Sequence, residues 1–225
     1  MGICRRQVEP VDLFDIDGGR ISAVGEFKYL GTLMSNQGGA TSEIFHRIQA
    51  ASVAYSHLKL LWNSRILSLK LKLRLFSVVI ASVLLYNSEC WTITHDDLCR
   101  LESFYFRCLR HLTRPIRCPG EPANFVDKVS KQTVFDVAKV PTITSLLHER
   151  RLRWLGHLLR SDPRDTAHQC LLREAESNSS WWKLLKEDLA TVHIRSFAEA
   201  KRLADDRAAW RTLTHARPGL RILCR

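Results

Sequence analysis

The chain has 225 residues, of which 45% are hydrophobic and 25% are charged. This balance is typical of a globular protein with a buried core, and it excludes a largely disordered chain. Lysine and arginine number 34 against 23 aspartate and glutamate residues, which gives a formal net charge of +11. This charge predicts an acidic partner, and we expect nucleic acid, because docked cations release counterions from a phosphate backbone. A basic surface without a specific partner is the alternative.

The cysteines and the apolar runs bear on where in the cell the chain is expected to be found. The seven cysteines form no CxxC pair, and the first residues lack the apolar stretch of a secretory signal. We therefore expect a reducing, intracellular location, in the nucleus or the cytoplasm. The longest apolar run, residues 75–86, contains two serines and is shorter than the roughly 20 residues of a membrane-spanning helix. No membrane partner is expected.

Residues 1–39 hold most of the glycines and predict β structure. Two apolar stretches, residues 11–16 and 20–24, flank Asp17-Gly18-Gly19, and glycine accepts the positive φ of a tight turn. This arrangement predicts a β-hairpin. Residues 27–30 alternate weakly before a further glycine and predict a third short strand.

Residues 40–114 contain neither glycine nor proline, so the commonest helix breakers are missing. Apolar residues from Ile44 to Trp62 recur at spacings of four and three, which predicts one amphipathic face. We expect this first helix to be capped by Thr41 or Ser42.

Two more helices follow in the same segment. Residues 69–75 alternate as a half-buried strand would, but the apolar run continues to Tyr86 and Ser68 can cap a helix, so length favours a helix. Thr94 is expected to cap a third helix, whose apolar face ends at Leu112. Residues 40–114 are therefore predicted to form three antiparallel helices.

The C-terminal part is predicted to be a second, small helical subdomain. Prolines and a glycine between residues 115 and 122 indicate a linker, which we extend over residues 115–141. Thr142 should cap a helix over residues 143–160. After a polar break, two further helices are expected, one opened by the capping box of Ser196 and Glu199. The other carries an apolar stripe of Trp182, Leu185, Leu189 and Val192.

Four side chains of types that bind zinc lie close in sequence: His95, Cys99, Cys108 and His111. If they share one helix, Cys99 and Cys108 are about 13 Å apart along its axis at ~1.5 Å per residue, while ligands of one zinc converge within ~4 Å. We therefore expect thiols packed in an apolar face and no metal site.

Asp15 and Asp17 share one face of a predicted strand, as carboxylates that hold Mg²⁺ for phosphoryl transfer do. Aspartate before two glycines is equally what a hairpin turn requires, and no third carboxylate is placed to complete a two-metal site. We expect no catalytic residue and no cofactor in this chain. A metal-dependent nuclease that uses these two aspartates is a further hypothesis.

Basic residues gather on three of the predicted helices, and we expect them to contact phosphates. Any one such cluster is also typical of a solvated helix face. The candidates are Lys70, Lys72, Arg74, Arg107, Arg110, Arg114, Arg117, Arg150, Arg151, Arg153, His157 and Arg160.

The six tryptophans could stack on the bases of a single strand. We expect most of them in the core, since Trp62 completes an apolar stripe. Only the neighbours Trp181 and Trp182 must point in two directions on a helix.

Several strings together resemble the C-terminal part of the reverse transcriptase polyprotein of non-LTR (LINE-type) retrotransposons. Residues 150–160 are similar to that family's "rrLrWlGHvlR" element, and residues 187–189 and 206–211 to its terminal "eDl" and "DRxxWr" strings. Residues 43–51 together with residues 59–62 look like its first thumb helix, and residues 84–91 look like the end of the second. Asn87 stands where the family tends to have glycine. The family's primer-grip strand is similar to a stretch of this chain that consists of Phe27, Lys28, Tyr29, Leu30 and Gly31.

The resemblance implies a parent enzyme that is an RNA-directed DNA polymerase with an endonuclease, uses Mg²⁺, and has an RNA template and a DNA primer as partners. The chain shows no fingers, no palm with its Tyr-x-Asp-Asp turn and no endonuclease. We therefore expect a remnant that grips template-primer but is not an enzyme on its own. The alternative is a helical protein–protein interaction module whose positive charge is incidental.

The fold that we expect is mainly α. A short β-hairpin or three-stranded β element, at the end of the palm and the primer grip, leads into a thumb-like three-helix bundle. A linker and a basic helical subdomain complete the chain. The four parts are assigned to residues 1–39, 40–114, 115–141 and 142–225.

Overall fold

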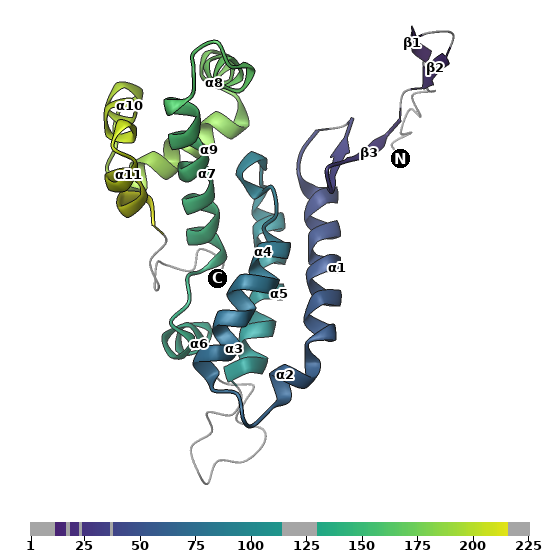
Figure 1. Cartoon of the computed structure of the whole chain (residues 1–225), viewed down its shortest axis with the longest axis vertical. Coiled ribbons are helices and arrows are strands. Elements are labelled where there is room, and N and C mark those ends of the chain that lie inside the picture. The colour runs from purple at the N-terminus through teal and green to yellow at the C-terminus, as the bar shows by residue number, and fades with distance from the viewer. Residues whose placement is uncertain (1–11, 17–18, 23, 37, 114–129, 216–225) are drawn as a thin grey trace, which may run out of the picture.

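The computed structural model describes residues 12–16, 19–22, 24–36, 38–113 and 130–215. Helices dominate these residues, and the strands lie near the N-terminal end (Figure 1). The expected fold class, mainly α with a short β-hairpin first, is confirmed.

The strands form two separate antiparallel pairs. β1 (Asp12–Ile16) pairs with β2 (Gly19–Ser22), with Asp15 opposite Arg20, as the predicted hairpin requires. β3 (Glu26–Tyr29) pairs with β4 (Thr32–Ser35), a strand that the sequence did not predict. The third predicted strand is therefore part of a second hairpin, and the described residues form no three-stranded sheet.

The turn between β3 and β4 explains why its second strand was missed. Leu30 and Gly31 both have positive φ, 47° and 83°, the backbone of a two-residue hairpin turn. Leucine is an uncommon residue at positive φ, so no Asn-Gly or Asp-Gly signal marks this turn.

Three antiparallel segments form the first helical layer (Figure 1). The first is α1 (Thr41–His57), followed by the short α2 (Lys59–Asn63). The second is one rod made of α3 (Leu69–Leu75), the π-helical η1 (Phe76–Ile80) and α4 (Ala81–Leu84). After η2 (Ser88–Cys90), the third is α5 (His95–Thr113). The apolar run at residues 69–86 is thus helical, as its length predicted.

Four predicted helix caps are present, and one was placed wrongly. Ala40 precedes α1 with no side-chain cap, so neither Thr41 nor Ser42 caps it. The Thr41 hydroxyl instead donates to Asp97 at 2.9 Å, which ties the start of α1 to the start of α5. The predicted caps Ser68, Thr94, Thr142 and Ser196 each accept a backbone N–H at a helix start. Ser130 and Ser179, which were not predicted as caps, do the same for α6 and α9.

The C-terminal part contains more helices than the sequence indicated. They are α6 (Lys131–Ala138), α7 (Ile143–Arg160), α8 (Thr166–Ser177), α9 (Ser180–Thr191), α10 (Phe197–Asp205) and α11 (Arg207–Thr214). α6 lies inside the range assigned to a linker, and α8 was not predicted. α6 has only 8 residues, and α8 buries only His168 and Leu171, so few apolar positions mark either helix in the sequence.

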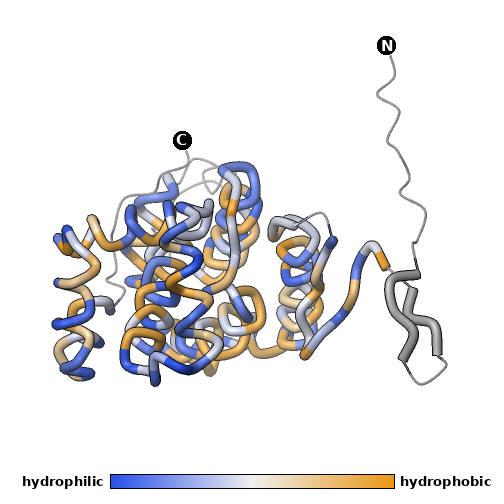
Figure 2. The backbone as a smooth tube through the Cα atoms, turned by 90° about the horizontal axis from the view of Figure 1, so that it is seen from above, coloured by the Kyte–Doolittle hydropathy of each residue, from blue (hydrophilic) through white to orange (hydrophobic). Residues whose placement is uncertain are grey.

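α7 belongs to both hydrophobic cores. Its first turns contribute Ile143 and Leu147 to the core of the first layer. Its later turns contribute Leu152, Leu155, Leu158 and Leu159 to a second core with α8 to α11. Seen from above, apolar and polar residues alternate around the helices (Figure 2). The core of the first layer therefore continues past residue 142, where the boundary between the linker and the C-terminal subdomain was predicted.

Candidate nucleic-acid interface

The predicted cluster on α3 is only partly at the surface. Lys70 and Arg74 are exposed, one helical turn apart. Lys72 is buried, and its Nζ donates to the Ser64 carbonyl at 2.6 Å. Lys72 therefore holds the start of the helical rod, and its assignment as a phosphate contact is corrected.

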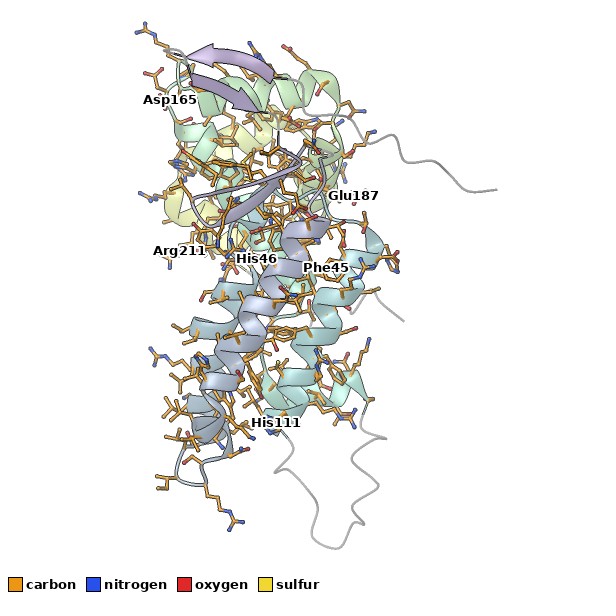
Figure 3. The ribbon with its side chains drawn as sticks, turned by 90° about the vertical axis from the view of Figure 1, so that its right-hand side faces the viewer. Phe45, His46, His111, Asp165, Glu187 and Arg211 are labelled. Atoms are coloured by element: carbon orange, nitrogen blue, oxygen red, sulfur yellow. The ribbon has the colours of Figure 1, made fainter. Side chains whose placement is uncertain are left out.

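The predicted cluster on α5 lies near the C-terminal end of that helix, away from α11. Arg107 is exposed, with its guanidinium 5.8 Å from the Phe104 ring centroid, and Arg110 is half-buried. His111, beside Arg110, lies toward the lower end of the bundle in Figure 3, well below Arg211. The other two predicted members, Arg114 and Arg117, lie outside the described residues.

Arg151 on α7 is an internal residue. It is 4% exposed, and its Nε and Nη2 donate to the two carboxylate oxygens of Asp188 on α9, at 2.5 and 3.0 Å. This buried, bidentate pair joins α7 to α9. The assignment of Arg151 to phosphate binding is therefore corrected to a structural role.

The remaining α7 candidates lie together with two arginines of α11. They line a groove of about 750 Å³, which we call the basic groove. Residues 150, 153, 157 and 160 follow each other at spacings of three and four, so they share one face of α7. The basic side chains of the groove are Arg150, Arg153, His157, Arg160, Arg207 and Arg211.

The basic groove is net positive, because its five arginines face two glutamates, Glu89 and Glu149. Arg153 pairs with Glu149 at 2.6 Å and is exposed. Arg207 and Arg211, one turn apart on α11, are also exposed. These three guanidinium groups can exchange their contacts for a phosphate at little cost, because exposed ion pairs contribute little.

Two arginines of the groove are positioned by backbone carbonyls. Arg150 donates to the Leu85 carbonyl at 3.0 Å, and Arg160 to the Ala204 carbonyl at 2.9 Å. Burial lowers the pKa of Arg150, while Glu89 raises it and Arg153 lowers it. A guanidinium has five N–H donors and remains charged in proteins, so both residues keep donors for a bound anion.

α11 is fixed to α7 by Trp210. Its indole Nε1 donates to the Leu152 carbonyl at 2.9 Å and lies over Gly156. Asp206 caps α11 by accepting the backbone N–H groups of Ala208 and Ala209. The backbone that carries Arg207 and Arg211 is therefore held against α7. The sequence analysis did not name these two arginines as site residues. Their spacing of four around a buried tryptophan was the available signal.

The primer-grip-like residues form the β3–β4 hairpin, on the opposite side of the molecule from α11 (Figure 1). Phe27, Lys28, Tyr29 and Leu30 are exposed, and Gly31 is half-buried. Arg47 donates to the Gly31 carbonyl, and the Tyr86 hydroxyl donates to the Leu30 carbonyl at 2.9 Å. The turn is thus held by α1 and by the end of the helical rod, with its aromatic side chains outside the core.

The candidate zinc ligands are spread along α5. Cys99 Sγ lies 3.5 Å from His95 Nε2, while His111 Nδ1 lies 2.7 Å from the Tyr55 hydroxyl. Burial raises the pKa of the Cys108 thiol to about 12, although Arg107 lowers it. No three His, Cys, Asp or Glu side chains are grouped to hold a metal within the described ranges. Asp17, of the other candidate pair, lies outside them.

His148 gives the α7–α9 contact a pH dependence. Its Nε2 lies 3.2 Å from Asp188 Oδ1. Burial lowers its pKa from 6.5, against the raising effect of Asp188, and Arg151 lowers it further. The unfolded chain therefore binds a proton more readily than the folded one, so stability from this group is present above pH 6.5 and is lost as the pH falls below it.

We accordingly expect the melting temperature to decrease between pH 7.5 and pH 5.5, and His148→Gln to flatten this decrease. Thermal unfolding followed by circular dichroism at several pH values measures both. His157 is exposed, so His157→Gln is the matched control and should leave the pH profile unchanged. An identical profile for His148→Gln and the unsubstituted chain would contradict the assignment.

Comparison of the chain with protein families, characterised proteins and solved structures finds no match. Among the helices that the structure describes, none is both long and apolar enough to cross a membrane. The class that fold and site define is a mainly helical protein with an arginine-lined groove between α7 and α11.

Proposed function

We propose that this chain binds nucleic acid, without catalysis of its own, through the basic groove. The observation that carries the proposal is the convergence of five arginines from two helices that are fixed to each other. Such an array attracts a phosphate backbone, and each docked arginine releases condensed counterions.

The sequence resemblance supports a more specific proposal. Both walls of the groove come from strings that resemble the reverse transcriptase family, residues 150–160 and 206–211. We propose that the chain corresponds to the C-terminal part of a non-LTR retrotransposon reverse transcriptase. RNA or DNA of a template-primer would be its partner, in the nucleus or the cytoplasm, and Mg²⁺ would belong to the parent enzyme. The exposed β3–β4 hairpin would then lie against the primer end.

Salt dependence tests the proposal. Binding of the full chain to a labelled single strand is measured between about 50 and 200 mM salt, and log affinity should fall linearly with log salt. The triple variant Arg153→Ala, Arg207→Ala, Arg211→Ala should bind more weakly and show a slope shallower by roughly 0.7 for each phosphate that it no longer neutralises. Fluorescence anisotropy measures both quantities.

The matched control removes the same charge elsewhere. Arg164, Arg173 and Arg202 are exposed and do not line the groove, so their triple replacement by alanine should leave the slope nearly unchanged. No binding at the lowest salt, or equal losses of affinity in the two triple variants, would contradict a site in the groove. Separate replacement of Lys70, Arg74 and Arg107 shows whether the other clusters also bind phosphates.

One observation favours the alternative, a protein–protein interaction module. Phe27, Tyr29, Leu30 and Met34 of the β3–β4 hairpin are each more than half exposed. A cluster of large apolar side chains at the surface often marks a site that another chain covers. In that case the charge is incidental, and both triple variants should behave alike.

A further inference from the structure

A second cavity adjoins the basic groove, and its lining is mainly apolar. Its volume is about 960 Å³, and we call it the indole pocket. It lies between the segment after η2, α7, and the helices α8 and α9. Its apolar lining includes Ile93, Trp154, Leu158, Leu171, Trp181 and Leu184.

Trp154 is shared by the two cavities, since it lines both the indole pocket and the basic groove. The helical period explains this. Arg150 and Arg153 face the groove, Leu158 faces the pocket, and Trp154 lies between these directions on α7. Glu89 and Cys90, consecutive in the chain, likewise line the groove and the pocket respectively. The two cavities are therefore adjacent.

We infer that the indole pocket takes a nucleobase of a single strand whose phosphates lie in the basic groove, with Trp154 as the stacking surface. This inference rests on the proposed function and adds to it the form of nucleic acid that is bound. A nucleotide is itself an aromatic ring joined to an anion, and here an aromatic pocket adjoins a cationic groove.

The pocket suits such an occupant in size and chemistry. Its volume lies within the ~300–1,000 Å³ of ligand sites. Thr92, Ser180 and Lys183 place two hydroxyls and an ammonium group in its lining, and these groups can hydrogen-bond to the edge of a base. Apolar walls with a few polar groups are typical of sites that orient a planar ligand.

The aromatic walls are held in place before a ligand arrives. Trp181 Nε1 donates to the Glu89 carbonyl at 2.8 Å, which fixes that indole. The His157 ring lies 5.2 Å from the Trp154 ring at 37° and supports it on the groove side. Rigid stacking surfaces lose little conformational entropy on binding.

A single strand is favoured over a duplex, because a paired base is stacked between its neighbours and cannot enter a pocket without being flipped out. Stacking on an aromatic side chain tolerates every base. We therefore expect little sequence preference.

The test compares strands of equal length and charge, with and without bases. One ligand is a single-stranded oligonucleotide of about 12 nucleotides, within the span of known single-strand sites. The other carries tetrahydrofuran abasic residues throughout. The full chain should bind the abasic strand at least about tenfold more weakly, because one stacked base raises the affinity about 5- to 150-fold. The salt slope should be the same for both strands.

Two variants locate the effect. Trp154→Ala should weaken binding of the ordinary strand about tenfold and leave binding of the abasic strand unchanged, and Trp154→Phe should retain most of the affinity. Circular dichroism and melting temperature check that both variants fold. The comparison of the two strands on the unsubstituted chain needs no variant.

The outcomes separate this inference from the proposed function. If the groove triple variant lowers the salt slope but the abasic strand binds as tightly as the ordinary one, phosphates bind and the base site is wrong. Equal affinity for a duplex of the same length would overturn it as well. If salt dependence is lacking altogether, the proposed function itself fails.

Discussion

Replacement of Asp188 by alanine is expected to lower the free energy of unfolding by about 3–5 kcal/mol. The carboxylate is 1% exposed and accepts two hydrogen bonds from Arg151, which is itself 4% exposed. Its removal leaves a buried guanidinium without its counterion, and the desolvation of that charge is no longer offset. Urea unfolding followed by circular dichroism measures the change as a lower midpoint.

Two controls separate burial of a charge from loss of an ion pair. Arg153→Ala breaks the Arg153–Glu149 pair, in which the arginine is exposed, and should cost less than about 1 kcal/mol. The double variant Arg151→Met, Asp188→Leu removes both buried charges and should recover most of the stability lost in Asp188→Ala. Equal stability of Asp188→Ala and Arg153→Ala would show that the pair is not buried in solution.

The Arg151–Asp188 pair shows what could not be predicted about the site from the sequence alone. Arg150 and Arg151 are neighbours in a run of basic residues, and nothing local distinguishes them. Their directions differ by about 100° around a helix, and Asp188, 37 residues away, decides which of them is internal. Lys72 was misassigned although its partner, the Ser64 carbonyl, lies nearby in sequence, because a backbone carbonyl leaves no mark in a charge pattern. Charge patterning predicts a helix face, while burial depends on partners that the pattern does not show.

Elements with strong local signals could be predicted. The caps at Ser68, Thr94, Thr142 and Ser196 follow from single hydroxyl groups, and the long helices follow from apolar periodicity. The β3–β4 hairpin was half missed because its turn residues, Leu30 and Gly31, carry only part of the usual signal. Short elements such as α6 owe their helical state mainly to packing, which a local pattern does not contain.

The basic groove depends on a tertiary contact of this kind. Its arginines come from two helices, α7 and α11, that are far apart in sequence. Beside the 3.2 Å contact of His215 with Glu149, the seat of Trp210 on α7 brings the two helices together. That seat requires glycine at position 156, because a Cβ there would lie 2.2 Å from Trp210 Nε1. The glycine is thus needed for close approach and not for an unusual backbone.

Gly156→Ala should therefore displace Trp210, break its 2.9 Å hydrogen bond to the Leu152 carbonyl and lower the unfolding free energy by about 2–4 kcal/mol. The better helix propensity of alanine, ~1 kcal/mol, offsets part of the cost. Because Arg207 and Arg211 move with Trp210, the variant should also bind a single strand with a shallower salt slope. Urea unfolding and fluorescence anisotropy measure the two effects.

Gly25→Ala is the matched control, because no described atom lies within 4 Å of a Cβ built there; stability should change by less than about 0.5 kcal/mol. Trp210→Phe, which keeps an aromatic ring but removes the indole N–H, should lose the hydrogen bond without the clash and so fall between the two glycine variants. A Gly156→Ala chain with the stability and salt slope of Gly25→Ala would mean that Trp210 does not hold α11 on α7. The arginines of the groove would then owe their convergence to another contact.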